Sequence, residues 1–152
     1  TLGTIGSENR VKCGVIGDCV NVASRVEGLT RTYGVPILTT EHTRTRLRGA
    51  FELRFVDRVV VKGHHQPVAL YEVYDGDPEP IREAKAFQQA RYERALTAYY
   101  GRDFRTALRA FAELREELPE DRVLALFLER SERHATEPPP DTWDGVEILL
   151  HK

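Results

Sequence analysis

Apolar residues recur at two different spacings along this chain, and the spacing changes near residue 75. In the first part, strand-like runs alternate with helix-like segments. Residues 11–16 are an apolar run that ends at Gly17. Asp18 is suited to cap a following helix, because its carboxylate accepts the free N–H groups of a first turn. An apolar stripe in that helix predicts one buried face: Val20, Ala23, Val26 and Leu29.

The pattern after this helix predicts three strands. Gly34 and Pro36 end the helix, and residues 35–38 have the composition of a strand. A short helix to about residue 47 follows, capped by Thr39 or Thr40. Residues 51–61 and 66–74 carry the strand signature twice more, with a turn predicted at residues 63–65.

Beyond residue 75 the pattern is helical. Residues 75–80 are turn-rich and charged, which predicts a break in regular structure, and helices are predicted at 84–100, 104–118 and 120–134. The spacing of four residues resembles the second half of a tetratricopeptide unit: Ala107, Phe111, Leu114 and Pro119. One such unit cannot bury its own apolar face, so we expect it to pack on the first part of the chain or on a neighbouring chain.

Composition narrows the class of protein. The chain has 152 residues, of which 41% are hydrophobic and 30% charged, as in a soluble globular protein. The net charge of -2 offers no basic field for nucleic acid, and no apolar run reaches the roughly 20 residues of a spanning helix. Because Thr1 comes first and residues 2–6 already look like the end of a strand, we interpret the chain as a fragment that begins inside a domain.

The sharpest motif is VIGDCVNVASRVEGL at residues 15–29. It puts Asn21 and Arg25 four residues apart, on one face of the predicted helix and away from the apolar stripe. An amide beside a guanidinium can hold a ribose and a polyphosphate whose charge rises in a transition state. Taken alone the pattern is common, and a surface pair without a task is the simpler interpretation.

The surrounding residues resemble the C-terminal half of a class III nucleotide cyclase catalytic domain. The family motif Gly-Asp-x-Val-Asn-x-Ala-(Ser or Ala)-Arg matches residues 17–25, and further blocks match at residues 3–7, 33–38, 57–63 and 67–73. The resemblance implies an α+β fold: a partial ferredoxin-like cyclase domain with a mostly antiparallel sheet, here followed by an α-helical tail. The expected domains are residues 1–74, a linker at 75–83, a helical tetratricopeptide-like segment at 84–136 and a tail at 137–152.

The resemblance assigns roles to single positions. Asn21 would orient the ribose for attack of its 3′ oxygen on the α-phosphate, and Arg25 would neutralise charge there. Lys62 would reach the terminal phosphates. Gly14, with Val15 beside it, falls at the position that reads the purine, and glycine has no side chain for this. The choice between ATP and GTP therefore stays open, with cyclic AMP favoured over cyclic GMP as the product formed with pyrophosphate.

The family's metal ligands are two aspartates that lie upstream of the matched half. We therefore expect Mg²⁺ or Mn²⁺ in an intact parent but no metal ligand in this chain, and His64 and His65 lack a third ligand nearby. Because the family's site forms between two catalytic domains, a homodimer is expected in the parent, and the fragment alone is expected to be inactive. Half of the sheet would also be missing, which predicts an open sheet edge.

The helical tail resembles, more loosely, the tails of bacterial membrane-anchored cyclases. This implies a catalytic region on the cytoplasmic side, tethered by an N-terminal region outside this chain, and a protein partner for the tail. A different class of function stays open: a non-catalytic, cyclase-like module for regulation or dimerisation, whose helical tail binds a protein.

Overall fold

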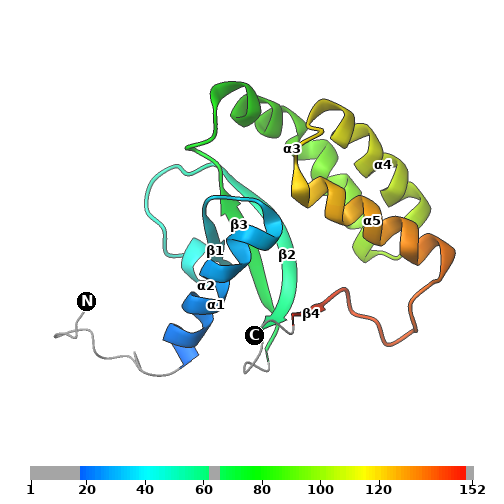
Figure 1. The fold of residues 1–152 in the computed structure, drawn as a ribbon, viewed down its shortest axis with the longest axis horizontal. Helices are drawn as coiled ribbons and strands as arrows, with labels where there is room; N and C mark the ends of the chain where they lie inside the picture. Colours follow the sequence, from blue (N-terminus) through cyan, green and yellow to red (C-terminus); the bar gives the residue numbers. More distant parts are fainter. Residues whose placement is uncertain (1–17, 62–65, 150–152) are drawn as a thin grey trace.

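The computed structural model describes residues 18–61 and 66–149, and the side chains among them from residue 26 to 60 and from 66 to 146. The elements follow one another along the chain as a mixed α/β arrangement (Figure 1). Their bounds are α1 (Asp18–Tyr33), β1 (Leu38–Thr40), α2 (Glu41–Arg44), β2 (Leu53–Val61), β3 (Val68–Val73), α3 (Glu79–Tyr100), α4 (Phe104–Glu117), α5 (Arg122–Thr136) and β4 (Glu147–Leu149).

A small sheet forms the centre of the first part, in the order β1-β3-β2-β4. β3 pairs antiparallel with β1 and with β2, so the expected antiparallel character is confirmed for these three strands. β4 pairs parallel with the end of β2, through residues 59–61 and 147–149. The C-terminal segment therefore pairs with part of the β2 edge of the sheet, and β1 forms the other edge. The ferredoxin-like assignment stays a prediction.

A β-bulge interrupts the pairing of β2 with β3. Phe55 lies opposite Tyr71, whereas Asp57 lies opposite Leu70, so Val56 is the extra residue. A bulge changes the phase of the in-and-out alternation along a strand. As a result Val56 and Asp57, which are neighbours in sequence, are both fully buried.

Local residue chemistry explains where the first elements begin and end. α1 covers the predicted helix and ends before Gly34, whose φ of 65° is a left-handed conformation that favours glycine. β1 begins later than predicted, at Leu38, because Pro36 has no N–H to give to a neighbouring strand. α2 is shorter than predicted and ends at Arg44, where the Thr45 hydroxyl donates to the His42 carbonyl at 2.9 Å and competes with the helical pattern.

The three predicted C-terminal helices are confirmed, although α3 begins five residues earlier and α5 two residues later than predicted. α3 begins at Glu79, inside the stretch predicted as a linker, because Pro80 lies in the first turn, where its missing N–H costs nothing. Asp103 caps α4 by accepting from the Thr106 N–H, and Asp121 caps α5 by accepting from two backbone N–H groups. The division of the chain into separate domains and the tetratricopeptide-like character of these helices stay predictions.

α3, α4 and α5 form a bundle beside the sheet (Figure 1). One continuous apolar cluster joins the bundle to the sheet and to α1. The expectation that the helical segment packs on the first part of the chain is therefore confirmed. Fully buried members from both parts include Val56, Val59, Leu70, Tyr99, Ala107, Phe111, Val123, Leu124 and Phe127.

Candidate functional site

Two of the predicted site residues, Asn21 and Arg25, fall in the N-terminal half of α1. Asn21 and Arg25 both lie on this helix, one turn apart, so the helix on which their proposed pairing depends is present. Their side chains are outside the described part of the chain, and so are Gly14, Val15 and Lys62 as whole residues. Lys62 comes directly after the last residue of β2.

The C-terminal half of α1 is held against the sheet. Val26, Leu29 and Tyr33 follow one another at helical spacing, and their exposed fractions are only 5%, 4% and 1%. The Tyr33 hydroxyl donates a hydrogen bond of 2.7 Å to Asp57 Oδ2 on β2. Burial, together with the Asp57 carboxylate, raises the pKa of Tyr33 far above its ordinary value of 10.0, so the hydroxyl stays protonated and able to donate.

Asp57 is the meeting point of three elements. Its carboxylate is fully buried and accepts the Tyr33 hydroxyl from α1. Arg130, from α5, donates to both of its oxygens, Nη1 to Oδ1 at 3.0 Å and Nη2 to Oδ2 at 2.9 Å. This is the two-pronged geometry in which a guanidinium and a carboxylate pair most strongly. We call Tyr33, Asp57 and Arg130 the α1 relay.

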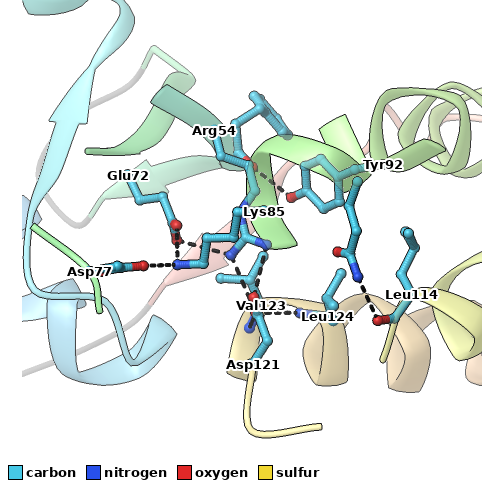
Figure 2. A network of polar contacts seen from close by, with 11 residues as sticks. Arg54, Glu72, Asp77, Lys85, Tyr92, Leu114, Asp121, Val123 and Leu124 are labelled. Atoms are coloured by element: carbon cyan, nitrogen blue, oxygen red, sulfur yellow. Dashed lines mark hydrogen bonds and ion pairs between the residues drawn. The ribbon is translucent and has the colours of Figure 1, made fainter. Parts of the chain in front are cut away.

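A second group of buried charges lies further along the same strand, and Figure 2 shows it from close by. Arg54 on β2 contacts Glu72, its cross-strand partner on β3, at 3.0 Å, and Asp121 at the start of α5, at 2.8 Å. Lys85 of α3 lies 2.6 Å from Glu72 and 2.6 Å from Asp77. We call these five residues the charge network. It fastens both α3 and α5 to the sheet.

Two further hydrogen bonds lie near the charge network, one between the bundle and the sheet and one between two helices of the bundle. The Tyr92 hydroxyl of α3 donates to the Phe55 carbonyl at 2.6 Å, and Gln88 Nε2 donates to the Leu114 carbonyl at 3.0 Å (Figure 2). Burial by itself would raise the pKa of Asp121, but the positive charge of Arg54 and its hydrogen bond outweigh burial and lower that pKa below 3.8.

Sequence reasoning did not single out these buried charges. A signal was present, since the charged residues Arg54, Asp57 and Glu72 lie within two mainly apolar strand runs. Pairing Arg54 with Glu72 required the strand register, and pairing Asp57 with Arg130 required the position of α5, 73 residues away in sequence. Neither follows from local spacing.

A divalent metal ion needs several His, Cys, Asp or Glu side chains grouped around one point. Within that part of the chain, no three His, Cys, Asp or Glu side chains are grouped so that they could hold an ion. The described helices also include none that is long and apolar enough to cross a membrane.

Comparison with known proteins points to one class, the adenylate cyclases. The chain is 34% identical over 132 residues to "Adenylate cyclase, terminal-differentiation specific" of Dictyostelium discoideum, a match that covers 85% of this chain and 6% of that protein. It is 48% identical over 75 residues to an adenylate cyclase of Anabaena cylindrica, covering 47% of this chain and 15% of the relative. It is 31% identical over 72 residues to adenylate cyclase 1 of Rhizobium meliloti (strain 1021), covering 47% of this chain and 11% of the relative.

These similarities support a cyclase family for the chain. The chain spans only a small part, between 6% and 15%, of the length of each of these relatives. The match of 132 residues is longer than residues 1–74, so in the Dictyostelium protein the similarity continues into the helices. No family model matches the chain, and no solved structure matches it.

Proposed function

We propose that this chain is part of a class III nucleotide cyclase that forms a 3′,5′-cyclic purine nucleotide and pyrophosphate from a nucleoside triphosphate. The observation that carries the proposal is its similarity to three proteins named adenylate cyclase, one of them matched along 85% of the chain. Those names favour ATP as the substrate and cyclic AMP as the product.

The proposed work of α1 is to hold the substrate while its own ribose attacks. The Asn21 amide positions the ribose so that the 3′ oxygen is in line with the α-phosphorus. The Arg25 guanidinium donates to the α-phosphate as its charge rises and pyrophosphate leaves. Lys62 contacts the terminal phosphates. Two donors one turn apart on a helix share one face, which allows both to reach the same ligand.

A second cyclase domain would complete the site. We assign Mg²⁺ or Mn²⁺ to ligands on a complementary half, supplied in a homodimer, where the ion would supply Lewis-acid chemistry to the bound nucleotide. This chain alone is then expected to show no turnover. Product formed by the purified 152-residue chain would contradict that assignment.

The decisive experiment uses a longer polypeptide that carries this sequence together with its upstream cyclase half. Arg25→Ala and Asn21→Ala should each lower the rate of cyclic nucleotide formation from ATP by about a hundredfold or more, because a donor to the transition state is lost. Arg31→Ala is the matched control, since Arg31 is an exposed arginine on the last turn of the same helix.

The two outcomes separate the functions. If the rate falls in the first two variants and not in the control, α1 carries catalytic residues. If both variants keep the wild-type rate, the assigned roles are wrong, and a non-catalytic module for regulation or dimerisation becomes the better account. Parallel assays with ATP and GTP decide the substrate.

A further inference from the structure

We propose that the α5 helix positions α1 for the cyclase reaction through the α1 relay, so that Arg130 and Asp57 are positioning residues although neither belongs to the motif at residues 15–29. This inference rests on the function proposed above and extends it to the helical tail. The tail is then part of what shapes the site, in addition to any partner that it binds.

α1 is held by apolar contacts and by a hydrogen bond. Val26 and Leu29 contribute apolar contacts, which favour burial but do not define a direction. Among the described side chains of α1, the Tyr33 hydroxyl provides the hydrogen bond that reaches another element of the fold. Hydrogen bonds are directional, so this bond restricts the rotation and the axial position of the C-terminal end of α1 more narrowly than the apolar contacts do. Asn21 and Arg25 lie on the same helix, about 12 to 18 Å away at 1.5 Å per residue.

α5 fixes the acceptor of that bond. Asp57 is fully buried, and both of its oxygens accept from Arg130, which holds the carboxylate in one orientation. Asp57 Oδ2 accepts from Tyr33 and from Arg130 at once. A shift of α5 therefore changes the point at which Tyr33 is anchored.

A separate contact brings α5 to the end of α1. The side chain of Arg122, in the first turn of α5, packs over Gly34, the residue that follows α1. A Cβ placed on Gly34 would lie 2.5 Å from Arg122 Cδ and 3.3 Å from Arg122 Cβ. Arg122 thus lies against the residue that follows α1, and Arg130, about two turns later in α5, reaches Tyr33 through Asp57. Small displacements of catalytic groups matter, since an error of about 1 Å can cost a hundredfold in rate.

The chain offers a matched control for the tyrosine. Tyr92 and Tyr33 are equally buried, each 1% exposed, and each donates its hydroxyl to β2, Tyr33 to a side chain and Tyr92 to the Phe55 carbonyl. Tyr92, however, belongs to α3, and its hydroxyl bonds the Phe55 carbonyl and none of the described side chains of α1. Phenylalanine at either position removes one oxygen atom and leaves the ring in place.

The experiment measures kcat, KM for ATP and the thermal midpoint of the longer polypeptide in three variants. Tyr33→Phe and Tyr92→Phe should lower the thermal midpoint by similar amounts. Tyr33→Phe should also lower kcat by about tenfold to a hundredfold with a smaller change in KM. Tyr92→Phe should leave kcat within about twofold of wild type. Arg130→Lys keeps the charge but loses the two-pronged geometry, and should lower kcat in the direction of Tyr33→Phe.

A second readout does not depend on turnover. In the 152-residue chain, Tyr33→Phe should speed amide hydrogen exchange along α1, and Tyr92→Phe should not. If Tyr33→Phe lowers kcat no more than Tyr92→Phe, or leaves exchange in α1 unchanged, the relay is structural only and the inference is wrong. Arg25→Ala, assayed in parallel, separates the two proposals. Its retained activity overturns the catalytic assignment, while loss in Arg25→Ala without loss in Tyr33→Phe overturns the relay alone.

Discussion

α1 and the junction between the sheet and the bundle differ in how they use polar residues. On α1, the residues for which we propose chemistry are recognised by a motif, and the helix is held by three buried side chains. At the junction, Arg54, Asp57, Glu72 and Lys85 are buried charges to which the family resemblance assigns no catalytic role. Buried ionisable groups often mark active sites, but structural ion pairs bury them as well. Here the buried charges indicate where two segments are joined, and the candidate chemistry lies on a different element.

The largest expected effect is on stability, at Asp57. Asp57→Ala leaves Arg130 buried without its carboxylate and removes the acceptor for Tyr33. We expect a loss of about 3–5 kcal/mol in the free energy of unfolding. Urea denaturation of the 152-residue chain measures it. Asp141→Ala, at an exposed aspartate, should stay within about 0.5 kcal/mol of wild type. Equal losses in the two variants would show that the buried carboxylate of Asp57 contributes no more to stability than an exposed one.

Lys62 tests the candidate chemistry, in contrast to the buried charges at the junction. We proposed that Lys62 contacts the terminal phosphates. In the longer polypeptide, Lys62→Ala should then raise KM for the nucleoside triphosphate by about ten- to a hundredfold, because that charged hydrogen bond would be lost. The thermal midpoint should hardly change. Arg58→Ala is the control, since Arg58 is an exposed cation on the strand that leads to Lys62. A similar rise in KM in both variants points to general electrostatic attraction of the substrate.

Gly34 lies where α1 and the junction meet. Gly34→Ala forces a side chain into a left-handed conformation and against Arg122, so we expect a loss of about 1–2 kcal/mol in stability. The double variant Gly34→Ala/Arg122→Ala should recover the steric part only. Gly76→Ala, where an added Cβ meets nothing within 4 Å, should be neutral, and a neutral Gly34→Ala would show that α5 does not press on the end of α1.

Acid should weaken the junction through Asp121. Its pKa is lower in the folded state than its ordinary value of 3.8, so the stabilisation is complete above that value and is lost as the pH falls below it. The Asp121→Asn variant should show a flatter decline of stability at acid pH, measured by denaturation between pH 5 and pH 2. An unchanged slope would mean that Asp121 is not charged and paired in the folded protein.

The smallest effect is expected for an ion pair outside the buried junction. Arg91 and Glu117 form a pair of 2.7 Å, but their side chains are 37% and 38% exposed, where solvent screens the attraction. Glu117→Gln should change stability slightly at low salt and not measurably at 1 M salt. If Glu117→Gln lowers the free energy of unfolding as much as Asp57→Ala does, burial does not explain why the Arg130–Asp57 pair should contribute more than the Arg91–Glu117 pair.

Local patterns were enough to predict most helices and strands. α1 with its apolar stripe, α4 after Asp103, and the hairpin strands β2 and β3 were predicted near their observed bounds, because periodicity and capping act over a few residues. Boundaries moved where a neighbour decided them, as at Pro36 before β1. The pairing of β4 with β2 was not predicted, since it joins residues more than 80 positions apart.

The sequence by itself determined the motif with Asn21 and Arg25 on one helix, and the class of protein that the comparisons support. Only the tertiary structure decided that α5 contacts the end of that helix, and that Asp57 links the two through Tyr33 and Arg130. The physical reason is the range of the interactions. Helix periodicity depends on residues that are close in sequence. The partner of a buried charge depends on strand register, on the bulge at Val56 and on the docking of a distant helix.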